Sequence, residues 1–518
     1  MERSWEKLRS LFESLTSRLE SLSFKKLILI LIIVWLLLYL PATFFLSIGQ
    51  SEEYYAYYPE AANPMDFDNK DYNVTTLPQS MEEAAGERFV KPIQNRTTVE
   101  FNWTAWDYDS SRHIGRINVY YELNGTEGVI RLKNVHRAGD VTSWAAEKTF
   151  KDEGTLKYYY RVDKDDISIF HRRTSVLLEG KNIYEEVRTG PPPLIHLFFI
   201  PPTLMTLSPE AGGAYLSFIL YFSIFILFDS LLLFSGFKEF GKSKAFLMSL
   251  LFMVNPVTIF NIHQDEAIVA FTMLLPLLFL IKKRDKISSI LAGISIPVKI
   301  WGGFIFPIYL LRKELGLKKR LKHVFSGVLV TSSIFLFFYL LWGSNSIWFL
   351  SQYSGTTEVM GLGPLSFWGR WLDVFSMSSQ DLPRTSILVC IGALELLILY
   401  LAYKKDRPPL MTLTSLLCVF FGLYVKIHWD YYIILFPFLL YFTVRDKRLF
   451  FAFVSIVSTI YLMMFFASTS FFVPSILMAL LNTLVLFLLL YHVFLFMRDK
   501  KIYRMELDEI WGRKEVEA

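Results

Sequence analysis

The sequence predicts a polytopic all-α membrane protein with a β-sandwich inserted on its extracytoplasmic side. Three observations support this fold class. Of the 518 residues, 53% are hydrophobic and 17% aromatic, with a mean hydropathy of +0.36, and soluble cores rarely carry so much apolar surface. Apolar runs of about the length of a membrane span recur along the chain. One polar region between the first two runs alternates apolar and polar residues.

The apolar runs account for the helical part of the prediction. Those long enough, or nearly long enough, to cross a bilayer are 27–47, 211–236, 245–262, 266–281, 324–343, 385–403, 409–427, 431–444, 449–467 and 474–497. With a re-entrant pair between 287 and 311, they give about 12 helices. Lys and Arg cluster between the runs, and such loops stay in the cytoplasm. This rule places both termini in the cytoplasm and residues 48–190 outside.

The orientation gives a domain order along the chain. The predicted segments are a cytoplasmic amphipathic segment (1–26), a first transmembrane helix (27–47), an extracytoplasmic region with an acidic linker and the β-sandwich (48–163, sandwich about 95–163), an interfacial helix with a Pro-rich membrane entry (164–207), a multi-span membrane domain (208–497) and a cytoplasmic tail (498–518).

The extracytoplasmic region carries its own signals. All four N-x-[ST] sequons of the chain lie in it, at Asn73, Asn95, Asn102 and Asn124. Residues 51–90 are acidic and poor in branched apolar residues, which predicts a linker. Beyond them, 99–103, 117–123 and 156–162 alternate with period two, and Asn124-Gly125 is a hairpin turn signal. The two cysteines, Cys390 and Cys418, lie in apolar runs, so neither a disulfide framework nor a thiolate metal site is expected.

The segment 287–311 lies between two basic clusters and is too short for two full spans at 1.5 Å per residue. It carries Gly293, Pro297 and Gly302 near its middle. We therefore expect a re-entrant pair of short helices with Lys299 near the tip. Broken helices at membrane depth line cavities or are buried in protein, and they often mark binding sites.

The stretch 166–180 predicts an amphipathic helix that lies in the membrane interface. Asp165 or Asp166 suits its N-cap, and Gly180 suits its C-terminal cap. The apolar face is expected at Ile167, Phe170, Thr174, Leu177 and Leu178, and the polar face at Ser168, His171, Arg172, Ser175 and Glu179.

Five motifs in this order resemble those of GT-C-fold glycosyltransferases, especially the polyprenyl-phosphate-mannose-dependent class, over about 164–440. They are DISIFHRRTSVLLEGKNIY…PPL (166–194), HQDEAIVAF (263–271), SILAGISIPVK (289–299), SFWGR (366–370) and KIHWDYYIILFPF (426–438). The chain departs from the family pattern at His263, where the family has Gly, and at Glu266, where it has Asp. The β-sandwich is a further departure, since the family's acidic residue follows the first span closely.

The resemblance implies an enzyme, a hexosyltransferase that moves a sugar from a polyprenyl- or dolichyl-phosphate donor to a glycan, lipid or protein acceptor. Mannose is the expected sugar. Such a reaction needs a carboxylate that takes the proton of the attacking hydroxyl. The resemblance assigns this role to Asp166, with Asp165 as the fallback. The ordinary alternative for Asp166 is a helix N-cap without chemistry.

Cationic groups are expected to stabilise the leaving phosphate. A charge inside an apolar hairpin is costly and often functional, so Lys299 is the first candidate; snorkelling to an interface is its alternative. Arg370 and His428 are further candidates, each with an ordinary interfacial role as the alternative. Gln264, Asp265, Glu266 and Tyr184 are expected to bind the acceptor or the sugar, although two carboxylates at a helix start are also stabilised by the helix dipole alone.

No metal cofactor is expected, because a lipid monophosphate donor carries no nucleotide diphosphate. Asp107-Tyr108-Asp109 resembles a metal-binding D-x-D, but its position after a predicted strand favours a turn. The expected partners are the lipid-linked donor and the acceptor, and no nucleic acid. The expected location is the plasma membrane, or the endoplasmic reticulum in a eukaryote, with the active site on the extracytoplasmic side.

Two other functions compete with this hypothesis. A secondary transporter or lipid-linked-sugar flippase would suit broken helices with Lys299 at depth, but it predicts an internal repeat, which the chain lacks. An adhesion or sensor protein would suit the β-sandwich, but anchoring needs far fewer helices.

Overall fold

The computed structural model describes residues 17–51, 54–57, 73–74, 90–105, 114–138, 141–164, 166–186, 191–206, 213–347, 362–377, 382–468 and 473–512. The chain forms two compact units. The helical unit comprises Met1–Ala42, Pro191–Ile195 and Leu220–Ala518, and the sheet unit comprises Thr43–Gly190 and His196–Ile219.

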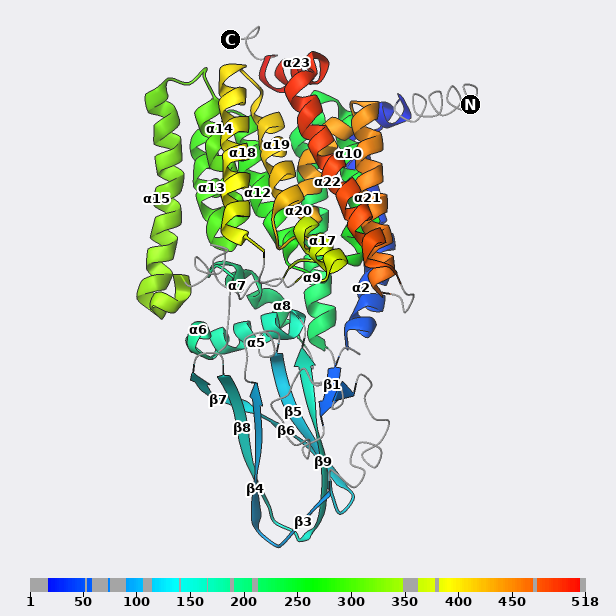
Figure 1. Ribbon diagram of the computed structural model, residues 1–518, viewed down its shortest axis with the longest axis vertical. Helices are drawn as coiled ribbons and strands as arrows, with labels where there is room; N and C mark the ends of the chain where they lie inside the picture. Colours follow the sequence, from blue (N-terminus) through cyan, green and yellow to red (C-terminus); the bar gives the residue numbers. More distant parts are fainter. Residues whose placement is uncertain are drawn as a thin grey trace. The chain divides into compact units, whose positions relative to one another are not determined.

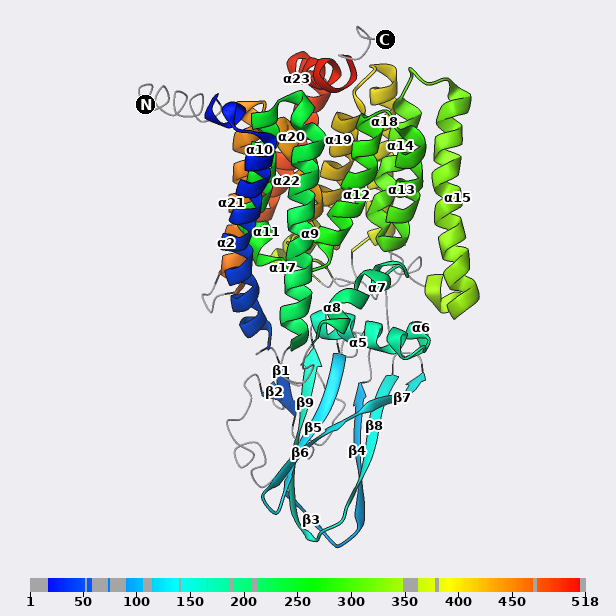
Figure 2. The ribbon, with the colours of Figure 1, turned by 180° about the vertical axis from the view of Figure 1, so that it is seen from behind.

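Six helices of the described residues are long and apolar enough to cross a membrane, which confirms a membrane protein. They are α2 (Phe24–Ser51), α9 (Gly213–Phe237), α15 (Leu317–Trp342), α18 (Arg384–Lys404), α21 (Lys447–Ser468) and α22 (Ser475–Arg498). Each lies on a predicted apolar run. The helix α2 packs along α9, where Trp35 Nε1 donates to Ser223 O at 2.8 Å (Figure 2). The total of about 12 helices stays a prediction.

Shorter apolar helices fill the helical unit. They are α10 (Lys242–Met253), α11 (Pro256–Phe260), α12 (Glu266–Ile281), α19 (Pro409–Leu423) and α20 (Tyr432–Thr443). Every residue of α20 is buried, as expected of a helix that is apolar all round. The predicted span 245–262 is wrong in one respect: it is two helices. Asn255 caps α11 through Val257 N at 3.0 Å, and Pro256 suits its first turn.

The segment 285–311 is a hairpin of short helices, as predicted. It consists of α13 (Asp285–Val298), the 3₁₀ turn η4 (Ile300–Ile305) and α14 (Phe306–Leu311). Lys299 has extended backbone, with φ −156° and ψ 140°, and ends α13 at the tip. At the open end, Arg312 forms an ion pair with Asp285. The two ends of the segment therefore lie at the same end of the helical unit.

Glycines let the hairpin pack closely on α15. A Cβ added to Gly293 would lie 2.5 Å from Gly327 O, so the two backbones meet with no side chain between them. Thr331 donates to Gly293 O at 2.9 Å from the α15 side. Gly302 has a similar role at the tip, where an added Cβ would lie 2.8 Å from the backbone of Ser295.

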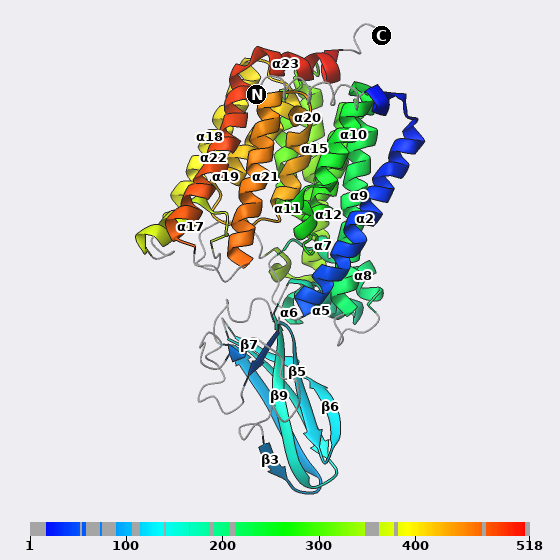
Figure 3. The same cartoon turned by 90° about the vertical axis from the view of Figure 1, so that its right-hand side faces the viewer.

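The C-terminal segment closes one end of the helical unit, while α17 (Phe367–Phe375) lies at the other end (Figures 1 and 3). The C-terminal segment consists of α23 (Lys500–Glu506) and the π turn η7 (Leu507–Gly512). Glu506 accepts from Leu410 N and Met411 N, both at 2.8 Å, and from Trp511 Nε1 at 2.9 Å. Glu509 pairs with Arg445 at 2.7 Å. Residues assigned to a tail thus pack on the start of α19.

The sheet unit contains two antiparallel sheets (Figure 2). The strands are β1 (Tyr54–Tyr57), β2 (Asn73–Val74), β3 (Val90–Ile93), β4 (Thr97–Ala105), β5 (Ile114–Leu123), β6 (Thr126–Arg131), β7 (Lys133–Ala138), β8 (Val141–Phe150) and β9 (Gly154–Lys164). One sheet has the order β2-β1-β9-β5-β6 with β3 also paired to β9, and the other has the order β4-β8-β7.

One hydrophobic cluster joins the two sheets. Phe101 of β4 packs edge-on against Tyr158 of β9, with ring centroids 5.3 Å apart. Asn124 and Gly125 have φ of 50° and 77°, which confirms the predicted hairpin turn between β5 and β6. The linker prediction for 51–90 is wrong at β1 and β2, because β1 pairs with β9 and β2 pairs with β1.

The predicted interfacial helix is α5 (Asp166–Leu178) in the sheet unit. It begins at Asp166, and Gly180 ends it with φ 75° while Lys181 N bonds to Val176 O at 3.1 Å, as predicted. The predicted faces are partly wrong, since Leu178 is 47% exposed and His171 is 5% exposed.

Aromatic packing explains this rotation of the buried face. The Phe170 ring stacks on Phe199 at 4.6 Å, and both Phe170 and His171 meet the ring of Phe218, at 6.5 and 6.4 Å. The helix α5 also contacts α6 (Ile183–Glu186) and α8 (Ile200–Leu204), while α7 (Ile195–Phe198) precedes α8 in the chain.

We expect Gly293→Ala to destabilise the protein by about 1–3 kcal/mol, because the new methyl group would overlap the backbone of α15. The matched control is Gly392→Ala on α18, where an added Cβ meets nothing within 4 Å. This control should be neutral or stabilising, by about 0.5–1 kcal/mol. Thermal unfolding in detergent can be followed by dye labelling of buried Cys418 in a Cys390→Ser background. Equal melting temperatures for the two alanine variants would contradict the close packing.

Candidate active site

Charged side chains meet at the tip of the hairpin, inside the apolar helical unit. Lys299 Nζ donates to Asp265 Oδ1 at 3.1 Å and also to Glu266 Oε1. The three residues are 7%, 5% and 1% exposed. Asp430 is buried as well and lies close enough to interact electrostatically with Glu266. We call Asp265, Glu266, Lys299 and Asp430 the tip cluster.

The local folding of each segment explains why these groups meet. Asp265 is the N-cap residue of α12 and Glu266 is its first residue, so both carboxylates lie where the helix dipole favours negative charge. Lys299 follows α13 in extended backbone. The turn η4 after it packs against both α12 and α19. The ammonium group is thereby brought to the N-terminus of α12.

An aromatic wall lies beside the tip cluster. Lys299 Nζ lies 5.1 Å from the centre of the Tyr431 ring, a cation–π distance. Trp301, only 1% exposed, packs behind Tyr431 with ring centroids 5.7 Å apart. The ring of His428 lies 5.5 Å from the same tyrosine. His428 and Lys299 thus lie against the same tyrosine ring.

The loop before α17 pairs with the segment that leads to His428. Gly363 N donates to Val425 O at 3.1 Å, and Leu365 N donates to Ile427 O at 2.9 Å. A Cβ on Gly363 would lie 2.3 Å from Ile427 O, so only glycine permits this approach. Trp368 Nε1 donates to Leu423 O at 2.8 Å and fixes the start of α17.

Arg370 is held within this loop. Its Nε donates to Pro364 O at 2.8 Å, and its Nη1 lies 3.6 Å from Asp373 Oδ2. Burial lowers the pKa of Arg370, and the neighbouring Asp373 opposes this effect. Arg370 therefore belongs to a loop whose backbone pairs with the segment before His428, whereas Lys299 belongs to the tip cluster itself.

The Pro-rich segment is bonded to the hairpin near its tip. Leu194 N donates to Pro297 O at 3.0 Å, within the helical unit. Pro297 O lies in the last turn of α13, where helix carbonyls lack an internal partner. Two motifs that the sequence resemblance placed in one family pattern are thus in direct contact.

Two predicted site residues belong to the sheet unit. Asp166 is the first residue of α5 and is partly exposed. Tyr184 is 5% exposed, with its ring 6.2 Å from that of His196. Burial raises the pKa of Tyr184, and the positive charge of Arg173 partly offsets this. Asp165 and the residues 107–109 lie outside the described residues.

The structure adds buried polar residues that the sequence analysis did not single out. Asp430 joins the tip cluster, and its position within the H-W-D-Y stretch was the available signal. In the sheet unit, Arg173 and His196 are 6% and 0% exposed. Burial, and then the charge of Arg173, lower the pKa of His196, which favours a neutral imidazole.

The tip cluster offers hydrogen-bonding and proton-accepting oxygens beside a cation, within apolar surroundings. Such a network can orient hydroxyl groups and stabilise charge, because water screens it little. Gln264 directly precedes it in the chain. Within the part of the chain that the structure describes, no group of three or more His, Cys, Asp or Glu is arranged to hold a metal ion.

Comparison with known proteins gives one match. Residues 191–425 match the model of Glycosyltransferase family 87. The matched segment is a little less than half of the chain, and it includes Asp265, Glu266, Lys299 and Arg370 but not Asp166, Tyr184 or His428. Together with the apolar helices, it supports a membrane glycosyltransferase. Neither the search of curated proteins nor the search of solved structures found a match.

We expect Lys299→Met to destabilise the protein by about 3–5 kcal/mol, because it leaves buried carboxylates without their cation. The triple variant Lys299→Met/Asp265→Asn/Glu266→Gln should recover most of this loss. The control Lys286→Met, at an exposed position of the same hairpin, should change stability by less than about 0.5 kcal/mol. Thermal unfolding in detergent measures all three. If Lys299→Met alone were as stable as the wild type, the ion pairs would not stabilise the tip of the hairpin.

Proposed function

We propose that the protein is a GT-C-type glycosyltransferase that transfers a sugar from a polyprenyl- or dolichyl-phosphate donor to an extracytoplasmic glycan, lipid or protein. Mannose is the proposed sugar. The observation that carries the proposal is the tip cluster. It is a buried charged network among apolar helices, and its members Asp265, Glu266 and Lys299 lie within the segment matched by a glycosyltransferase family. A donor whose tail lies in the bilayer suits a polar site of this kind.

In the proposed reaction, an acceptor hydroxyl oxygen attacks the anomeric carbon of the donor sugar. The bond from that carbon to the phosphate oxygen breaks, and the lipid phosphate leaves with its electron pair. Asp166 takes the proton of the attacking hydroxyl. Its place at the first position of α5 supports this role, because the positive end of the helix dipole favours the ionised carboxylate that a base requires.

Lys299, Arg370 and His428 would stabilise the leaving phosphate. Lys299 is already paired with two carboxylates, so the donor phosphate would share its ammonium group with them. This arrangement favours the departing phosphate, whose negative charge is greater than that of the bound donor. Arg370 and His428 would approach from the paired segments 363–365 and 425–427.

Gln264, Asp265, Glu266 and Tyr184 would bind hydroxyl groups of the sugar or the acceptor. Carboxylates accept hydrogen bonds from sugar hydroxyls, and a buried network discriminates strongly against groups that leave it unpaired. We propose no divalent metal, because a lipid monophosphate lacks a diphosphate that would need one. We also propose that the two sheets form a β-sandwich on the extracytoplasmic side of a plasma membrane, with both termini in the cytoplasm.

We expect Asp166→Asn to lower the rate of sugar transfer by about 10²–10⁴-fold, because it removes the base while keeping the size of the side chain. Membrane vesicles supplied with radiolabelled polyprenyl-phosphate-mannose and an acceptor extract would measure transfer. The control is Asp152→Asn, an exposed aspartate in the turn between β8 and β9, which should leave the rate unchanged.

Transfer at the wild-type rate by Asp166→Asn would remove this residue from the mechanism. If the wild-type protein moved the lipid-linked sugar across the vesicle membrane but transferred no sugar to the acceptor, the flippase alternative would be favoured over the glycosyltransferase.

A further inference from the structure

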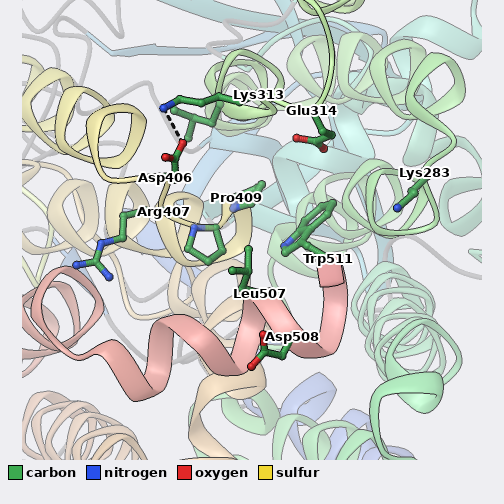
Figure 4. Close-up of a pocket in the computed structure, with 11 residues that line it drawn as sticks. Lys283, Lys313, Glu314, Asp406, Arg407, Pro409, Leu507, Asp508 and Trp511 are labelled. Atoms are coloured by element: carbon green, nitrogen blue, oxygen red, sulfur yellow. Dashed lines mark ion pairs between the residues drawn. The ribbon is translucent and has the colours of Figure 1, made fainter. Parts of the chain in front are cut away.

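A polar pocket lies at the open end of the α13–α14 hairpin, away from the tip cluster. It has a volume of about 320 Å³ (Figure 4). Three loops line it, after α12, α14 and α18, together with the C-terminal segment. The lining residues on which the inference depends are Lys283, Lys313, Asp406, Arg407, Leu507 and Trp511. None of them belongs to the proposed sugar-transfer site.

The pocket lies where apolar helices end. The helices α12, α14 and α18 end at Ile281, Leu311 and Lys404, and α19 begins at Pro409. Where apolar helices end and charged loops begin, the lipid headgroups meet the protein. A ligand at this level is therefore more naturally a headgroup than a solute of the membrane interior.

The charges around the pocket leave one lysine uncommitted. Lys313 pairs with Asp406 at 2.6 Å, which links two of the lining loops, as Figure 4 shows. Glu314 pairs with Arg312. Lys283 is exposed and has no ion pair with any residue that the structure describes. Its ammonium group adds positive charge to an end of the helical unit that is already rich in Lys and Arg.

The backbone of two lining residues is strained. Lys283 has φ 55° and Asp406 has φ 50°, each just after the last turn of a helix. Glycine is the residue that adopts this conformation without a steric penalty. Non-glycine residues held in the left-handed region concentrate at functional sites. Here both strained positions carry charged side chains that line one pocket.

Apart from the charged residues Arg407 and Asp508, the rest of the lining is apolar and aromatic. Trp511 lies on the pocket with Arg312 over its ring at 5.3 Å. Leu507 and Pro409 complete this side (Figure 4). On the adjoining α18, Leu396 and Tyr400 are 68% and 57% exposed, so the nearby surface is suited to acyl chains.

We propose that this pocket binds the phosphate headgroup of an anionic membrane phospholipid. Lys283 and Lys313 would contact the phosphate, and Trp511 with Leu507 would contact the glycerol portion. Of the three acidic lining residues, Glu314 and Asp406 are already paired with Arg312 and Lys313, which leaves the charge of Lys283 for the phosphate. Soluble phosphate would offer this pocket the same phosphate group. The apolar part of the lining and the position at the helix ends favour the lipid over soluble phosphate. This inference does not depend on the sugar transferred.

The test uses the full-length protein, purified in detergent and titrated with phosphatidylglycerol while bound lipid is counted by native mass spectrometry. Phosphatidylcholine and inorganic phosphate are parallel titrations. We expect phosphatidylglycerol to bind and the other two not to compete at equal concentration. Lys283→Gly should weaken binding by about fivefold, since each basic residue near a lipid surface contributes about that factor.

Lys283→Gly separates binding from folding. It removes the charge and also relieves the left-handed strain, so the lipid-free protein should be at least as stable as the wild type. Lys286→Gln, an exposed lysine of α13 that does not line the pocket, is the control and should bind as the wild type does.

Undiminished binding by Lys283→Gly would overturn the proposal. So would equal binding of phosphatidylcholine. Displacement of the lipid by inorganic phosphate alone, or stabilisation by phosphate and not by phosphatidylglycerol, would overturn the lipid assignment.

Discussion

The ion pairs of Lys299 with Asp265 and Glu266 hold together the part of the structure on which the proposed chemistry depends. A single charge among apolar helices is very costly, whereas opposite charges in contact can be accommodated. The broken backbone at Lys299 makes this contact possible, because a continuous helix would carry the lysine past the start of α12. The other end of the hairpin is closed by Arg312 and Asp285. The hairpin is thus fixed by a charge pair at each end.

Helix length explains how a charged cluster can lie within a membrane protein. The helices α12 and α20 have 16 and 12 residues, which is about 24 and 18 Å at 1.5 Å per residue. The hydrocarbon core of a bilayer is about 30 Å thick. The C-terminal ends of both helices lie at the end of the helical unit that is rich in Lys and Arg. Because the helices are short, their polar N-terminal ends fall short of the opposite membrane surface. This depth is what the proposed lipid-linked donor would require of the tip cluster.

The features that depend on residues close together in the chain were predicted from the sequence. The hairpin followed from two basic clusters too close together for two spans, and the Asn124-Gly125 turn and the Gly180 cap followed from residue type. The partners of Lys299 lie 34 and 33 residues earlier in the chain, so no local pattern indicates them. The buried face of α5 was missed for a related reason. It is set by the rings of Phe199, between α7 and α8, and Phe218, in α9, both distant from α5 in the chain.

The contact of Glu506 with the start of α19 has a consequence for biosynthesis. Pro408 and Pro409 provide no side-chain oxygen to cap this helix, and Glu506 supplies the acceptor from almost one hundred residues later in the chain. During translation, the amide groups at the start of α19 therefore lack this protein acceptor until α23 has been made. The last helix of the described chain thus completes the cap of a helix made much earlier.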